Sequence, residues 1–126
     1  MLPKPKICAA CPFYGDGQGF VPDQLIENST VLVLAQNPGK NEEAGERISG
    51  YSGGTPITEP CEPQPLIGAT GWVLDKTYLP LAGLTRDTVS VANVIKCRVG
   101  GKNDLPTTTP EYTQAVHHCT RHHLII

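Results

Sequence analysis

Two short apolar runs stand out in a chain that is otherwise rich in turn-forming residues. Residues 31–35 are VLVLA, bounded by NST at 28–30 and by NPG at 37–39. Residues 89–95 are VSVANVI. A short apolar run between turn signals is typical of a strand that is buried on both faces, as in a parallel sheet. The pattern therefore predicts two parallel strands.

The apolar positions between these two runs recur at helical spacing. Trp72, Leu74 and Leu79 fall on one stripe, which predicts a helix over residues 71–83 with Pro80 close to its end. A strand, a helix and a second strand in this order form a βαβ unit. The predicted fold class is therefore α/β.

A second helix is predicted over residues 109–123. Thr109 is a good N-cap, Pro110 suits the first turn, and Glu111 favours the positive end of the helix dipole. Residues 46–65, in contrast, are dense in Gly, Pro, Ser and Thr. They predict a long irregular loop, or an insertion, between the first strand and the first helix.

Length and composition describe one small domain. The chain has 126 residues, of which 39% are hydrophobic, and a net charge of −2. Such a chain gains little general attraction to phosphate, so a nucleic-acid site needs a local basic patch such as Lys96, Arg98 and Lys102. No apolar run has the length of a membrane span or of a signal-peptide core. We therefore expect a single domain over residues 1–126, in the cytoplasm and without a membrane partner.

Four of the five cysteines suggest a metal centre. Cys8 and Cys11 form a C-x-x-C pair, while Cys97 and Cys119 come from the last third of the chain. Four thiolates can hold either an iron–sulfur cluster or a structural zinc. A mixed zinc site that used a histidine of residues 117–123 would leave Cys97 without a role. An odd number of cysteines also argues against a complete disulfide framework.

Two asparagines follow the predicted strands at equivalent places. Asn37 comes just after the first strand and Asn93 lies at the end of the second. Ligands of open α/β sheets bind beyond the carboxyl ends of the strands, so both side chains are expected at one cleft. Glu42 and Glu43 lie close by as a reserve carboxylate pair, although a solvated first helical turn is the simpler interpretation.

The motifs, taken together, resemble the iron–sulfur uracil-DNA glycosylases, family 4 of that superfamily. The matching elements are, in order, C-x-x-C-P-F, A-Q-N-P-G-x-x-E-E-x-G, L-I-G-x-x-G-x-x-L-D and N-V-I-K-C-R. The resemblance implies a three-layer α/β/α sandwich with a short, mainly parallel sheet. It also implies removal of uracil from DNA by hydrolysis of the N-glycosidic bond. A structural [4Fe–4S] cluster would be held by Cys8, Cys11, Cys97 and Cys119.

The resemblance also assigns a base pocket. Backbone N–H groups at Gln36 and Asn37 would face the uracil O2 atom, and Asn37 would orient the attacking water. The amide of Asn93 would donate to O4 and accept from N3–H, a pairing that cytosine reverses. Leu66 stands where the family has an aromatic residue that stacks on uracil. The expected partner is uracil-containing DNA, bound by a monomer.

Several departures from the family motivate other interpretations. The family motif G-E-A-P-G is A-Q-N-P-G here, closer to the G-I-N-P-G of mismatch-specific glycosylases. The second active-site motif, a His-bearing loop, is absent from residues 1–126, and the apolar residues 124–126 resemble the start of a strand. We therefore expect the N-terminal portion of a larger domain, inactive as given. The alternatives are a non-catalytic nucleic-acid binder and a zinc-stabilised structural module.

Overall fold

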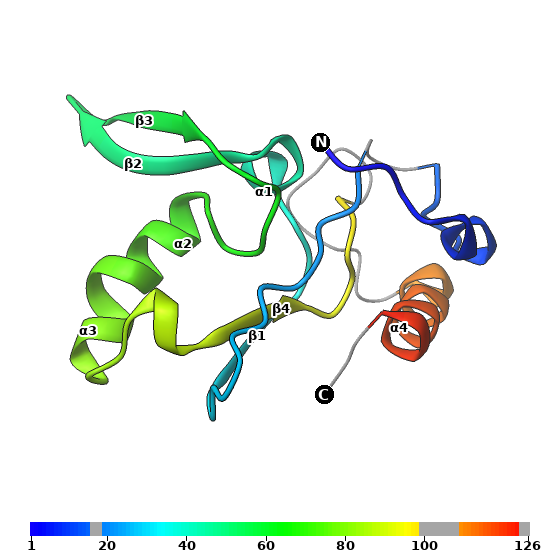
Figure 1. The fold of residues 1–126 in the computed structure, drawn as a ribbon. Helices are drawn as coiled ribbons and strands as arrows, with labels where there is room; N and C mark the ends of the chain where they lie inside the picture. The colour runs from blue at the N-terminus through cyan, green and yellow to red at the C-terminus, as the bar shows by residue number, and fades with distance from the viewer. Residues whose placement is uncertain (16–18, 99–108, 124–126) are drawn as a thin grey trace.

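The computed structural model describes residues 1–15, 19–98 and 109–123 (Figure 1). Short helices and two small sheets alternate along this part of the chain, which confirms the α/β class. No helix in these ranges is long and apolar enough to cross a bilayer. The elements are η1 (Lys6–Ala10), β1 (Leu32–Ala35), α1 (Lys40–Ala44), β2 (Glu46–Ser52), β3 (Thr55–Pro60), α2 (Ala69–Val73), η2 (Leu74–Tyr78), α3 (Leu79–Leu81), η3 (Arg86–Thr88), β4 (Ser90–Asn93) and α4 (Pro110–His122).

The two predicted strands pair in parallel at the centre of the molecule (Figure 1). The register runs from Leu32 opposite Ser90 to Ala35 opposite Asn93. Every residue of β4 is buried, as expected. The prediction for β1 is wrong in one respect, because Leu32 and Leu34 are 40% and 50% exposed. Only one face of β1 packs against a core in the described part of the chain.

That core lies between the sheet and a continuous helical stretch. Its buried members are Leu74, Leu79, Val89 and Val91, with Val33 packed against them. The helical stretch consists of α2, η2 and α3 and covers most of the predicted helix over 71–83. The middle piece, η2, is a π-helical segment. The helix prediction is therefore confirmed, with its start two residues earlier.

The segment predicted to be an irregular loop contains an antiparallel hairpin. Strands β2 and β3 pair from Glu46 opposite Pro60 to Ser52 opposite Thr55, and the hairpin projects from the body of the protein (Figure 1). Gly53 and Gly54 have φ values of 56° and 82°, which a two-residue hairpin turn requires and glycine adopts without strain. Every residue of β3 is exposed, and an exposed edge strand tolerates proline.

A second core lies on the opposite side of the sheet from this hairpin, where η1 packs beside α4 (Figure 1). Its buried residues are Cys11, Phe13, Ile95, Cys97, Ala115 and Cys119. The helix prediction for 109–123 is confirmed, and the Thr109 hydroxyl accepts a hydrogen bond from the backbone N–H of Tyr112 at 3.3 Å. The loop predicted at 99–108 and the strand predicted at 124–126 lie outside the described residues.

Candidate metal centre and base pocket

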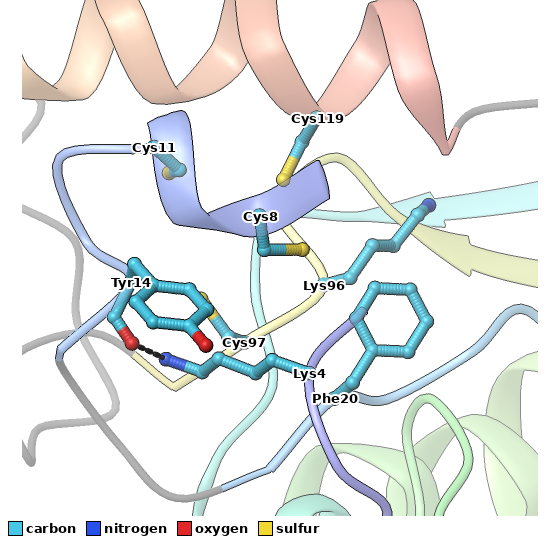
Figure 2. Close-up of a pocket in the computed structure, with 8 residues that line it drawn as sticks. All are labelled: Lys4, Cys8, Cys11, Tyr14, Phe20, Lys96, Cys97 and Cys119. Atoms are coloured by element: carbon cyan, nitrogen blue, oxygen red, sulfur yellow. Dashed lines mark hydrogen bonds between the residues drawn. The ribbon is translucent and has the colours of Figure 1, made fainter. Parts of the chain in front are cut away.

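The four predicted metal ligands line one pocket (Figure 2). Cys8 lies in η1, Cys11 directly follows it, Cys97 lies after β4, and Cys119 lies in α4. Each is at most 7% exposed, and none forms a disulfide. The structure thus brings together cysteines from both ends of the described chain. Lys4, Tyr14, Phe20 and Lys96 complete the lining.

Short-range hydrogen bonds shape the N-terminal part of this pocket. The backbone N–H of Cys11 donates to the Cys8 carbonyl at 2.9 Å, which closes the turn of the C-x-x-C pair. The Lys4 ammonium donates to the Tyr14 carbonyl at 2.6 Å and so ties down the residues after the pair (Figure 2). These hydrogen bonds fix the backbone of the turn that carries the C-x-x-C pair.

Burial disfavours the charged form of three of these thiols. It raises the pKa of Cys97 to about 12, and it is also the main cause of the raised pKa values of Cys8 and Cys119. Repulsion between neighbouring cysteines adds to the increase in the pKa of Cys8. A hydrogen bond from the Lys96 backbone partly counters the raised pKa of Cys119. These three thiols would become thiolates more readily beside positive charge, which a metal centre would supply.

The arrangement of these side chains bears on which metal group the pocket could hold. Within the described ranges, no group of three or more His, Cys, Asp or Glu residues is arranged to hold a single metal ion. A four-iron cluster is larger than one ion, so its cysteine ligands stand further apart than those of zinc. Four thiols around one pocket are a donor set that suits either a four-iron cluster or a structural zinc.

The histidines near Cys119 differ in their exposure and contacts. His117 and His122 are exposed, as expected for a helix face, whereas Nε2 of His123 lies 3.2 Å from Cys8 Sγ. The His123 ring also packs edge-on against Phe20, with centroids 4.9 Å apart. Burial lowers the pKa of His123, and the nearby His118 lowers it further. The His123 ring thus lies against Cys8 and Phe20, two of the residues that line the pocket.

Lys96 does not belong to an exposed basic patch, so that prediction is wrong. Its side chain is 1% exposed, and its ammonium forms an ion pair with Asp23 at 2.6 Å. The same ammonium donates to the backbone carbonyl of Asn93 and points away from the cysteines (Figure 2). Sequence spacing could not reveal this role because the partner acid lies 73 residues away. Lys102 lies outside the described residues.

The side chain of Asn93 is the most unusual polar group in the described structure. The residue is 1% exposed, yet neither its amide nitrogen nor its amide oxygen has a hydrogen-bond partner among the described residues. Leaving such a group buried and unpaired costs about 1–3 kcal/mol. Native structures rarely accept this cost without a reason, so the amide is a candidate for binding a ligand.

The turn after β1 lies next to Asn93. The backbone N–H of Ile95 donates to the Gln36 carbonyl at 3.0 Å, so the two strand ends stay paired beyond the sheet. Gln36 itself is exposed, and Asn37 is half-buried with its amide 3.2 Å from the Pro38 carbonyl. Asn37 and Asn93 therefore lie at one end of the sheet, as their spacing predicts.

A cavity of about 360 Å³ opens at this turn. Asn37 and Leu66 line it, whereas Gln36 and Asn93 are not among its lining residues. The structure thus brings two of the four proposed pocket residues into one cavity and leaves the other two beside it. The volume is near the lower end of the range of small-molecule pockets, roughly 300–1,000 Å³. The other lining residues are Gly39, Lys40, Asn41, Glu42, Ile48, Tyr51, Pro56, Gly68, Ala69, Thr70 and Gly71.

Glu42 joins two walls of this cavity. The pair Glu42 and Glu43 is buried, at 9% and 7% exposure, so the expectation of a solvated helical turn is wrong. One carboxylate oxygen of Glu42 accepts from the Gly39 N–H at 2.7 Å, and the other accepts from the Gly68 N–H at 2.7 Å. A glutamate three residues after Gly39 is a helix-start signal that could have indicated the first of these contacts.

Leu66 is held in an unusual backbone conformation at the cavity wall. Its φ value is 53°, in the left-handed region that non-glycine residues rarely adopt. The Arg86 guanidinium donates to the Leu66 carbonyl at 2.8 Å and to Asp75 at 3.0 Å. A Cβ atom on Gly71 would lie 1.9 Å from that same carbonyl. Arg86 and Gly71 therefore position Leu66, a role that sequence patterns did not reveal.

Comparison with known proteins supports the superfamily assignment drawn from the motifs. No protein-family model matches the chain. Two curated relatives are named Type-4 uracil-DNA glycosylase: the protein of Sulfurisphaera tokodaii is 26% identical over 97 residues, and that of Saccharolobus solfataricus is 23% identical over 97 residues. Each match covers 77% of this chain.

The chain is therefore similar in sequence to type-4 uracil-DNA glycosylases, which supports the resemblance to their superfamily. The matched region covers 36% of the first relative and 37% of the second. The chain thus spans about a third of the length of the curated relatives it matches.

Proposed function

We propose that this protein acts in base excision repair by removing uracil from DNA. The reaction is hydrolysis of the N-glycosidic bond of a nucleotide flipped out of the duplex, because a stacked base cannot be reached by the enzyme. The superfamily relationship supports the reaction class, and the cavity at the end of the sheet supports the place. We further propose that the described elements belong to a three-layer sandwich and that the protein is a cytoplasmic monomer.

The buried, unpartnered amide of Asn93 is the observation that carries this proposal. A uracil edge offers one acceptor and one donor in adjacent positions, and an asparagine amide offers the complement. Asn93 lies beside the cavity and not in its lining, so a base would have to reach past the cavity wall to satisfy both orphan atoms. A cytosine edge would place donor against donor, so the same buried amide would reject it.

The turn at Gln36 and Asn37 would supply the second part of the chemistry. Negative charge develops on the leaving base as the glycosidic bond breaks, and backbone N–H groups aimed at the O2 atom would stabilise it. The Asn37 amide, half-buried at the cavity, would hold a water for attack on the sugar. An asparagine orients water but is a weak base, so catalysis would depend mainly on charge stabilisation.

Four cysteines around one pocket support a structural [4Fe–4S] cluster as the resident cofactor. Such a cluster, when bound, would cross-link η1, the segment after β4 and α4, and it would take no part in bond cleavage. The residues that would hold it are Cys8, Cys11, Cys97 and Cys119. Zinc remains the alternative, and visible absorption with iron and sulfide analysis distinguishes the two, because zinc sites are colourless.

A second candidate function is non-catalytic binding of nucleic acid. Glu42 is the acidic residue among those that line the cavity, and both of its carboxylate oxygens accept hydrogen bonds from the backbone. This carboxylate is therefore already engaged, which favours binding without catalysis. Glu43 likewise accepts from the Gly19 N–H at 3.2 Å. A binder of this kind would retain uracil-containing strands without cleaving the glycosidic bond.

A direct assay separates these functions. The protein is incubated with a uracil-containing oligonucleotide and with the same sequence carrying thymine, and free base and alkali-labile sites are measured. Release of uracil from the first substrate alone supports the glycosylase. Retention of the oligonucleotide without release, by protein whose cofactor content is intact, would reject catalysis and favour the binder.

A further inference from the structure

The hairpin of β2 and β3 forms one wall of the cavity beside Asn37. Ile48, Tyr51 and Pro56 line that wall, and Tyr51 lies opposite Pro56 in the strand register. The root of the hairpin is fixed to the body, since the Ile48 N–H donates to the Ile67 carbonyl at 2.9 Å. Tyr51 is the aromatic residue among those lining the cavity. The facing wall, around Leu66, offers only an aliphatic side chain.

We propose that Tyr51 is the base-stacking residue of this cavity and that the hairpin carries it into the site. This inference rests on the proposed function for the identity of the base, but it requires only that a nucleobase enters the cavity. The ligand class is a single nucleobase from a flipped nucleotide or a single strand. Stacking on an aromatic side chain accepts any base, so Tyr51 would supply affinity while Asn93 supplies selectivity.

The Tyr51 ring is already oriented by a neighbour. It meets the Trp72 ring edge to face, with centroids 5.6 Å apart and planes inclined by 74°. Such a contact occupies at most one face of a ring, so at least one face of Tyr51 is not used by Trp72. The side chain is 43% exposed. Pre-orientation lowers the entropic cost of stacking, because little rotamer freedom remains to be lost.

Two glycines in the lining of the cavity allow neighbouring segments to pack closely. Gly68 and Gly71 line it, and a Cβ at Gly68 would lie 2.9 Å from the Glu42 carboxylate. The Glu42 carboxylate therefore holds this part of the lining close to the turn that bears Asn37. Tyr51 and Leu66 both line the cavity, so a base bound there would have an aromatic and an aliphatic side chain among its neighbours. Ligand pockets are commonly lined by side chains of these two kinds.

The test is the affinity for uracil-containing single-stranded DNA, measured by fluorescence anisotropy of a labelled oligonucleotide. Replacing Tyr51 by alanine should weaken binding by about 5- to 150-fold, the effect of losing one stacked base. Tyr51→Phe should bind as the unmodified protein does, because the ring is kept. Ile57→Ala is the matched control, since Ile57 is equally exposed on the same hairpin and does not line the cavity.

The single tryptophan of the chain gives a readout that needs no catalysis. Because Trp72 touches Tyr51, adding uridine monophosphate should change its emission in the unmodified protein and in Tyr51→Phe, but not in Tyr51→Ala. Unfolding in urea checks that each variant is folded. A Tyr51→Ala variant that binds the oligonucleotide as tightly as the unmodified protein, and whose emission responds to uridine monophosphate in the same way, would overturn the inference. Failure of the unmodified protein to bind DNA would also overturn it. Loss of binding in Tyr51→Ala without uracil release by any variant would support the stacking role and reject only the glycosylase.

Discussion

The cysteine-lined pocket and the cavity beside Asn37 are built from the chain in opposite ways. The first takes its lining from Lys4 to Cys119 and is completed only when the two ends of the described chain meet. The second takes its lining from Asn37 to Gly71. The contacts that shape it, through Glu42 and the hairpin root, are mostly within this segment. Contacts between residues far apart in the sequence stabilise the cysteine-lined pocket, so it should be lost together with the whole fold on unfolding. The cavity beside Asn37 should be lost by local unfolding of its own segment.

The largest expected effect comes from removing a cysteine of the pocket. Cys97→Ser should abolish the visible absorption of a cluster and make folding fail or nearly fail, because structural metal binding contributes directly to folding free energy. Cys61→Ser is the matched control, since Cys61 is free and does not line this pocket. Absorbance, iron content and thermal unfolding are the measurements. A brown, stable Cys97→Ser protein would contradict the assigned ligand set.

The buried ion pair of Lys96 and Asp23 gives the next largest effect. Lys96→Met should lower the free energy of unfolding by about 3–5 kcal/mol, because it leaves the Asp23 carboxylate buried without a partner. The double variant Lys96→Met with Asp23→Leu should recover most of this loss. Urea unfolding measures both. Equal destabilisation in the single and double variants would show that the cost arises from packing and not from the orphaned charge.

Replacing Asn93 should affect stability and function in opposite directions, which separates a structural role from a ligand-binding role. Asn93→Leu removes two unpaired buried atoms at similar volume, so the free energy of unfolding should stay level or rise by about 1–3 kcal/mol. In the assay of uracil release, the proposed activity should nevertheless fall about 10²- to 10³-fold, as when a key transition-state contact is lost. A large loss of stability would instead indicate a structural role.

The smallest effect should come from crowding the cavity wall. Gly71→Ala would place a methyl group 1.9 Å from the Leu66 backbone carbonyl, so the backbone must shift and the cost should reach or exceed the roughly 1–3 kcal/mol of ordinary overpacking. The better helix propensity of alanine offsets about 1 kcal/mol of this. Gly50→Ala is the control, because nothing lies within 4 Å of its added carbon. Affinity for DNA should fall in Gly71→Ala and not in Gly50→Ala, with cofactor content unchanged in both.

The parts of the fold that follow local rules were predicted from the sequence. Strand β4 and helix α4 were found because an apolar run and a capped helix start are properties of adjacent residues. The pairing of β1 with β4 followed from the expected βαβ order. The hairpin was missed because its Gly and Pro content outweighed its strand pattern. The dipeptide of Gly53 and Gly54 was the available signal.

Most of the site contacts that were missed join distant parts of the chain. Lys96 was assigned to the surface from its charge, since nothing near it in sequence indicates Asp23. The Arg86 contact with Leu66 crosses 20 residues. The burial of Glu42 likewise depends on the Gly68 loop, 26 residues further on. The spacing of residues in the sequence can place side chains at one end of a sheet. It cannot show which of these side chains form hydrogen bonds or ion pairs with each other.

The segment from Asn93 to Cys97 is shared by both regions. Asn93 ends β4 beside the turn that lines the cavity, and Cys97 faces the cysteine-lined pocket four residues later. Between them, the Lys96 ammonium holds the Asn93 carbonyl, and the Lys96 carbonyl accepts from the Val21 N–H at 2.7 Å. Inserting or deleting one residue here would move one site out of alignment with the other. The length of this five-residue bridge is therefore fixed, and neither site can be re-engineered by changing it.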